Sequence, residues 1–189
     1  MKNTCYPVLF LFFFLQMSFA GAQTIIYQKG VYQKKWTQRS VLSQPKGFRP
    51  QPEIYLTKKY IKSILKKFKN GASFVLTEEV YNRPNAVLGD KSDCQFVYTK
   101  AQMDEILAKS KGSVRGLERE LYMKPGSLDR VRLMRIDVDD PKNYKLRMPT
   151  GNEPGVNDSW TPGGHYPNEY YQAVISRVPK SEVRATRIQ

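Results

Sequence analysis

The pattern of apolar and polar positions predicts short helices and strands along most of the chain. From Leu56 to Gly71 the apolar residues recur at the spacing of one helical face, with Thr57 placed to cap the helix and Asn70-Gly71 to end it. A capping box at Thr99-Lys-Ala-Gln102 opens a second helix that runs to about Lys109. A third helix is expected over Val114–Leu121, capped by Ser113.

Strands are expected where short apolar or alternating runs occur, at Ser73–Leu76, Gln95–Tyr98, Val131–Val138, Tyr171–Val178 and Val183–Ile188. A turn at Pro179-Lys180 should join the last two of them, while residues 78–93 read as irregular. Together these elements predict an α+β protein. We expect one compact domain with a small, mostly antiparallel sheet, two or three helices and a long functional loop.

The first 22 residues have the pattern of a secretory signal peptide. Lys2 precedes an apolar run from Val8 to Leu15, and Ala20-Gly-Ala22 offers small residues at a cleavage site before Gln23. A transmembrane anchor is the alternative, but the run is short for a bilayer and Gln16 interrupts it. We therefore expect a protein exported through a cleaved signal peptide, either periplasmic or secreted.

Charge divides what remains into two parts. The chain has 31 Lys and Arg against 17 acidic residues, and the stretch 23–70 holds twelve of the bases and one acid, Glu53. Residues 23–52 are polar and contain several prolines, which favours a poorly ordered basic leader, with short strand-like pieces, that folding does not need. The expected division is a signal peptide over 1–22, a leader over 23–52 and an α+β domain over 53–189.

The helix after the leader carries lysines on the side opposite its apolar stripe. They are Lys58, Lys59, Lys62, Lys66, Lys67 and Lys69. A solvated face, a surface that binds nucleic acid or another polyanion, and a helix that lies on an anionic membrane are all compatible with this pattern.

Cysteine and histidine counts exclude several kinds of site. A structural zinc site needs four thiolate or imidazole ligands, and the chain has two Cys and one His, so we expect no metal site. Cys5 would leave with the signal peptide, and Cys94 alone cannot form an internal disulfide. The glycine-rich pieces fit neither the dinucleotide-binding nor the P-loop spacing.

The stretch from Asp139 to Glu169 has no helical or strand periodicity, and a loop of this length is usually functional. Arg147 could pair with a phosphate or carboxylate, Glu153 could act as a base, and Trp160 could stack on a base or nicotinamide. Further candidates in the loop are Thr150, Asn152, Asn157 and His165. The alternative is a structural loop whose polar side chains satisfy its own backbone.

Several short pieces resemble the C-terminal toxin domains of bacterial polymorphic toxins, the variable tips of Rhs-repeat and filamentous-haemagglutinin-type proteins. These pieces are Ile54–Tyr60, Gly71–Ser73, Phe96-Val97, Gln102–Asp104, Arg135–Val138, Leu146–Glu153, Trp160–Gly164 and Ala173–Ile175. The resemblance covers about residues 54–188, and its most specific piece is Thr-Gly-Asn-Glu followed by Trp-Thr-Pro-Gly-Gly.

This resemblance implies an exported antibacterial effector, active in competition between bacteria, that meets a cognate immunity protein. The family pattern usually has Glu where this chain has Gln172, a candidate catalytic position. A weaker similarity to NAD-consuming toxins, of the ADP-ribosyltransferase or NAD-glycohydrolase kind, implies Glu153 or Glu169 at the ribose and Arg135 or Arg147 at the pyrophosphate. NAD would then be a substrate and no cofactor would be bound.

Two alternatives from other classes remain open. A ribonuclease toxin would use His165 with a basic residue and a hydroxyl, and the net charge of +14 suits RNA. A non-enzymatic exported protein would use the same charge to bind nucleic acid or an anionic envelope.

Overall fold

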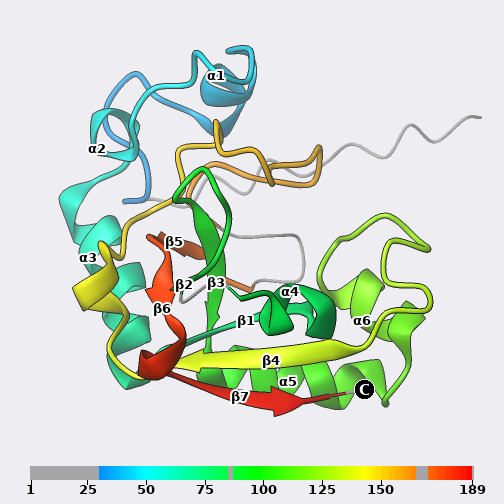
Figure 1. The fold of residues 1–189 in the computed structure, drawn as a ribbon. Helices are drawn as coiled ribbons and strands as arrows, with labels where there is room; N and C mark the ends of the chain where they lie inside the picture. The colour runs from blue at the N-terminus through cyan, green and yellow to red at the C-terminus, as the bar shows by residue number, and fades with distance from the viewer. Residues whose placement is uncertain (1–29, 85–86, 165–169, 189) are drawn as a thin grey trace, which may run out of the picture.

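A computed structural model of the chain describes residues 30–84, 87–164 and 170–188. The expected signal peptide, the first residues of the expected leader (23–29), His165 and Glu169 lie outside the described residues. Mixed helices and strands form a single compact α+β domain around one main sheet (Figure 1). This confirms the fold class predicted from the sequence.

The main sheet has five strands, all paired antiparallel, in the order β5-β3-β1-β4-β7. In chain order they are β1 (Ala72–Thr77), β3 (Gln95–Thr99), β4 (Leu133–Val138), β5 (Ala173–Ile175) and β7 (Val183–Arg187). In the centre, Ser73 of β1 lies opposite Tyr98 of β3 and Asp137 of β4. Side chains alternate between the two faces of these strands, so each face carries its own core.

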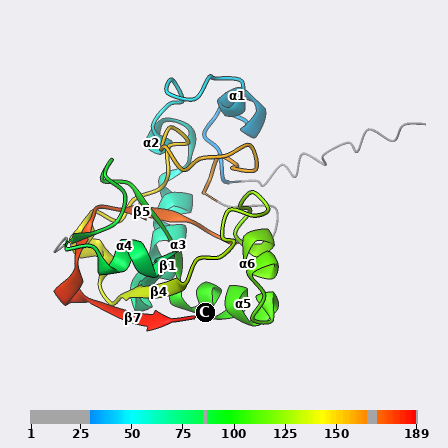
Figure 2. The ribbon, with the colours of Figure 1, turned by 45° about the vertical axis from the view of Figure 1, so that its right-hand side comes forward.

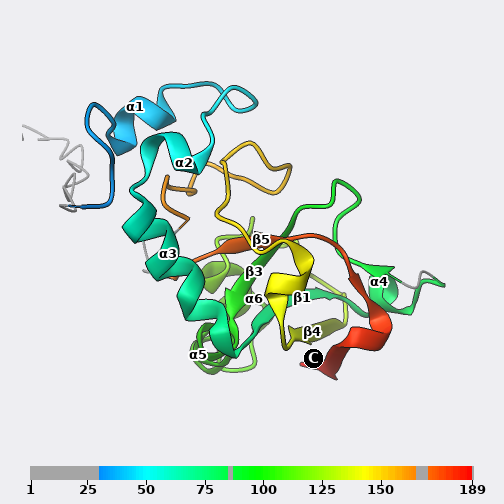
Figure 3. The ribbon, with the colours of Figure 1, turned by 90° about the vertical axis from the view of Figure 1, so that its left-hand side faces the viewer.

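One face is covered by α3 (Lys58–Lys67), which continues as the 3₁₀ turn η1 (Phe68–Asn70). Figure 3 shows α3 running along the molecule beside the sheet. Ile64 and Phe68 are buried with Phe74 and Ile136 of the sheet, so the apolar stripe packs as its spacing predicted. The side chain of Thr57 caps the helix and Gly71, with φ of 102°, ends it.

The other face is covered by α5 (Lys100–Ser110) and α6 (Val114–Glu120), where Met103, Ile106 and Leu117 pack with Tyr98 and Leu133. The predicted capping box at Thr99 and Gln102 is formed, and Ser113 caps α6. Figure 2 shows these two helices next to each other at the lower right.

Several short elements were not expected from the sequence. They are α1 (Gln38–Leu42), α2 (Pro52–Tyr55), α4 (Glu78–Asn82), β2 (Val87–Leu88), β6 (Val178–Pro179), and the 3₁₀ turns η2 (Pro141–Tyr144) and η3 (Lys180–Glu182). The described residues therefore contain six α-helices where two or three were predicted. Each of the missed helices has only four or five residues, too few to show a helical period.

The end of the chain also differs from the prediction. β5 and β7 lie at opposite edges of the main sheet and do not pair. Between them, β6 pairs with β2 in a separate two-stranded sheet and η3 leads into β7. The strand expected over 171–178 is thus two strands, β5 in the main sheet and β6 in the two-stranded sheet, because the chain leaves the main sheet after Ile175.

The expectation of a poorly ordered leader is wrong for residues 30–52. Val31 and Val41 are buried in the main core, and the Trp36 ring lies 6.3 Å from that of Tyr55. Tyr32 forms a β-bridge with Leu56. These apolar residues are few and widely spaced, but residues distant in sequence bury them. The free energy gained by that burial orders the segment despite its polar composition.

None of the helices in the described ranges has the length and apolar character needed to cross a membrane.

Candidate functional site

Glu153 is a buried and fully hydrogen-bonded carboxylate in the long loop. Its Oε1 accepts hydrogen bonds from the Thr150 amide at 2.9 Å and from Nη1 of Arg147 at 2.8 Å. Its Oε2 accepts one from the Gly151 amide at 2.9 Å, and the side chain is 2 % exposed. Burial acts to raise the pKa of this carboxyl, but the bonds from Arg147 and the amides outweigh it and hold the pKa below its ordinary value.

Arg147 lies at the start of the loop, where its backbone pairs with Val174 of the edge strand β5 through two bonds of 2.9 Å. Its side chain is 40 % exposed, and Nη2 donates to Sγ of Cys94 at 3.3 Å. A cavity of about 430 Å³ opens here, lined by Gln51, Cys94, Arg147, Thr150, Asn152, Glu153 and Pro154. Arg147 can therefore meet an anionic group that enters the cavity.

The ionised Glu153 is poorly placed to act as a general base. Taking a proton would weaken its bonds to Arg147 and to two buried amides at the same time. What its contacts can do is fix the position of the Arg147 guanidinium. The structure thus pairs a buried carboxylate, Glu153, with a partly exposed guanidinium, Arg147.

Asn152 binds the N-terminal segment. Its Oδ1 accepts from the amides of Gly47 at 2.8 Å and Arg49 at 3.2 Å, while Nδ2 donates to the Arg49 carbonyl at 2.9 Å. Lys46 adds bonds to the carbonyls of Pro154 and Val156. Figure 2 shows the segment with α1 and α2 beside this loop. Asn152 is therefore used inside the fold, where substrate binding had been expected.

Trp160 is 2 % exposed, so the expectation that it offers a stacking platform is wrong. A β-carbon at Gly151 would lie 2.4 Å from its ring, and the Arg49 guanidinium lies 5.0 Å from the ring centroid. The indole is an apolar anchor of the loop, because these contacts and its burial leave no open ring face for a base or a nicotinamide.

Two other predicted site residues lie apart from this cavity. Nδ2 of Asn157 donates to the Tyr122 carbonyl at 2.8 Å, and its Oδ1 accepts from the Ser159 amide at 3.0 Å. Gln172 is 5 % exposed, and its Nε2 donates to the Tyr98 hydroxyl at 2.7 Å. The cavity lining includes neither residue, and a catalytic role for Gln172 stays a prediction.

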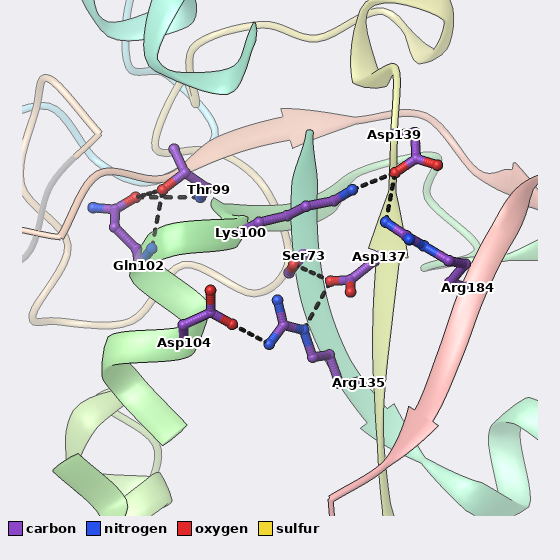
Figure 4. Close-up of polar contacts among 9 residues, drawn as sticks. All are labelled: Ser73, Thr99, Lys100, Gln102, Asp104, Arg135, Asp137, Asp139 and Arg184. Atoms are coloured by element: carbon purple, nitrogen blue, oxygen red, sulfur yellow. Dashed lines mark hydrogen bonds and ion pairs between the residues drawn. The ribbon is translucent and has the colours of Figure 1, made fainter. Parts of the chain in front are cut away.

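Arg135 lies on β4, on the face that α5 covers (Figure 4). Its Nε donates to Asp137 at 2.8 Å, and Nη1 pairs with Asp104 of α5. Asp137 also accepts from Ser73. These contacts tie α5 to the sheet, and Arg135 does not line the Arg147 cavity, so a substrate-binding role for Arg135 stays a prediction.

A second hollow lies beside α3. A groove of about 420 Å³ is lined by Tyr60, Ser63, Ile64, Lys66, Lys67, Lys69 and Tyr171. All six lysines of the helix and η1 are exposed. In the described part of the chain the lysines that form ion pairs are Lys100 and Lys109, and neither belongs to this face. Hereafter this set of six lysines is called the α3 lysine face.

Sequence reasoning missed Gln51, Cys94 and Tyr171 as lining residues. No local pattern marks them, since each reaches its cavity from a segment distant in sequence. Across the described ranges, no group of three or more His, Cys, Asp and Glu side chains is placed to hold a metal ion. No model of a known protein family matches the chain, and a search of curated proteins finds no significant similarity.

Proposed function

We propose that this protein is an exported, toxin-like effector that binds nucleic acid through the α3 lysine face. The observation that carries the proposal is the row of exposed lysines on one packed helix, without carboxylate partners in the described residues. Clustered lysines on a rigid element attract phosphates and release the counterions around them. The toxin-like character and a cognate immunity partner rest on the sequence resemblance.

The packing of α3 favours nucleic acid over a membrane. An interfacial helix binds lipid by burying its apolar face in the bilayer boundary. In this protein Ile64 and Phe68 are buried in the core, and Tyr60, Ile61 and Leu65 pack against it. The helix therefore has charge to offer to an anionic partner but no apolar face to insert.

A binding series with three lysines removed tests the proposal. The triple variant Lys66→Gln, Lys67→Gln, Lys69→Gln should bind a 20-nucleotide RNA at least about tenfold more weakly than the unaltered protein. The slope of log K against log salt should fall by about 2, at about 0.7 per phosphate contact on a single strand.

The matched control changes three exposed lysines elsewhere, Lys91→Gln, Lys111→Gln and Lys124→Gln, and so removes the same charge. Equal losses in the two triple variants would show only a net-charge effect and contradict the proposal. Binding to anionic phosphatidylserine vesicles, with none to RNA, would replace nucleic acid by a membrane surface.

A second candidate function is consumption of NAD at the Arg147 cavity. It is favoured by the accessible guanidinium of Arg147 in the wall of this open hollow of about 430 Å³. In this candidate Arg147 binds the pyrophosphate and Glu153 positions Arg147. Incubating the purified protein with NAD tests this candidate, and Arg147→Ala should abolish the loss of NAD while leaving RNA binding unchanged.

A further inference from the structure

The groove between α3 and Tyr171 combines charge with an aromatic ring. Lys66, Lys67 and Lys69 line it from the helix side, and Tyr171 lines it from the residues just before β5. Nζ of Lys67 lies 4.6 Å from the centroid of the Tyr171 ring. The ammonium group therefore lies over the ring face at this groove, on a long and exposed side chain. A base that stacks on the ring displaces this ammonium, which can then pair with a phosphate beside the base.

We propose that this groove selects single-stranded nucleic acid, with a base stacked at Tyr171 and the flanking phosphates on Lys66, Lys67 and Lys69. The inference rests on the proposed function and specifies its ligand. Proteins that bind single strands combine a cationic groove along the backbone with aromatic rings on which bases stack. The bases of a duplex are already stacked on each other, so a duplex can use the lysines but not the ring.

The position of the groove supports this arrangement. Tyr60 forms part of its wall and is fixed there, because its hydroxyl donates to the Gly163 carbonyl at 3.0 Å. Ile64, also in the wall, is 2 % exposed and anchors the helix in the core. Tyr171 itself is half-buried and packs against the main core. A ring held by rigid elements costs little ordering entropy when a base stacks on it.

The lysine face also has the length of a short strand of phosphates. Lys58 and Lys69 mark its ends along the helix and η1. At about 1.5 Å per residue the face extends roughly 16 Å, several times the spacing of about 3.4 Å between successive phosphates of one strand in a duplex. Lys58, Lys59 and Lys62 do not line the groove, so they can meet only phosphates of a strand that continues past it around the helix.

The test compares four probes on the unaltered protein: a 12-nucleotide single-stranded RNA, a DNA of the same sequence, the corresponding RNA duplex, and an abasic strand of equal phosphate number. The two single strands should bind about tenfold or more tightly than the duplex and the abasic strand, since one stacked base contributes about a factor of ten. A preference for RNA over DNA, or the reverse, would identify the natural source of the strand.

Two variants locate the effect. Tyr171→Leu should lower single-strand affinity about tenfold and leave duplex affinity unchanged, while Tyr171→Phe keeps the preference. Melting temperatures of both variants show whether the fold is retained. Should Tyr171→Leu fail to fold, the abasic comparison still decides, because it needs no substitution.

The two proposals fail differently. Equal affinity for the single strands, the duplex and the abasic strand, with a loss in the triple lysine variant, would overturn the stacking inference and leave lysine-dependent binding intact. Absence of binding to all four probes would overturn the proposed function itself.

Discussion

Gly151 lies directly against the ring of Trp160. A β-carbon at position 151 would come within 2.4 Å of Cη2, closer than real atoms approach, and the backbone there has φ of +85°. The loop can close over its buried indole only because this position has no side chain. The Gly151 amide in turn donates to Glu153, which lines the Arg147 cavity.

Gly151→Ala should therefore lower the free energy of unfolding by about 2 kcal/mol or more, through overpacking added to the cost of a positive φ. Gly47→Ala is the matched control, since Gly47 has φ of +97° but no atom within 4 Å of the point that a β-carbon would occupy. The difference between the two variants in denaturant unfolding measures the steric contact alone. Equal losses would mean that Trp160 adapts freely.

Glu153→Gln should lower the free energy of unfolding by more than about 1 kcal/mol, because the buried carboxylate holds two amides and Arg147. The control Glu79→Gln changes the same charge at an exposed helix pair and should cost less than about 0.5 kcal/mol. Any consumption of NAD should fall beyond the loss of folded protein, because Glu153 fixes the Arg147 guanidinium. Full stability with lost activity would instead make Glu153 catalytic.

Acid should act on stability through the same carboxyl. The pKa of Glu153 is lowered in the folded protein, so its stabilisation is complete above the ordinary value of 4.5 and is lost as the pH falls through the folded value. Urea unfolding at a series of acidic pH values should show a shallower loss of stability for Glu153→Gln than for the unaltered protein. Parallel curves would show that the carboxyl titrates normally.

The N-terminal segment should contribute to stability. Val41 is fully buried, so Val41→Ala should lower the free energy of unfolding by about 1–3 kcal/mol. Val80 is 36 % exposed in another short helix, and Val80→Ala provides a control with the same side-chain change. An unaffected melting temperature for Val41→Ala would restore the interpretation of residues 30–52 as a dispensable leader.

Local signals in the sequence predicted the elements that carry their own stop and start residues. Thr57 and Gly71 bound the lysine-bearing helix as expected, and the Thr99–Gln102 capping box opens α5. Alternation over Val131–Val138 predicted β4. The observed strand begins at Leu133, so the first two residues of the predicted range lie outside it. In each case the deciding interaction lies within a few residues of the element.

Long-range packing decided what the sequence could not show. β5 and β7 occupy opposite edges of the sheet because the chain pairs β6 with β2 on the way, a contact about 90 residues apart in sequence. Residues 30–52 are held by Val31 and Val41, whose partners come later in the chain. The polar residues around these two valines give no pattern from which their burial could be predicted.

The candidate site was predicted in part. Residue type and loop length pointed to Arg147 and Glu153, and the structure places both at one cavity. The burial of Trp160 was missed because the sequence does not distinguish an exposed indole from a buried one. The residue packed against its ring is Gly151, which has no side chain and so gives no hydrophobic pattern that would indicate the contact. Tyr171 gave no signal, since its link to Lys67 spans more than 100 residues.

Photo-cross-linking determines whether nucleic acid lies along α3 and stacks at Tyr171. A single-stranded RNA carrying 4-thiouridine is cross-linked to the unaltered protein, and the modified peptides are mapped by mass spectrometry. We expect cross-links at Tyr171 and within residues 58–69. An unlabelled single strand should suppress these cross-links strongly, and an abasic strand should suppress them only weakly. Cross-links concentrated in residues 145–164, with none at α3 or Tyr171, would contradict this binding mode.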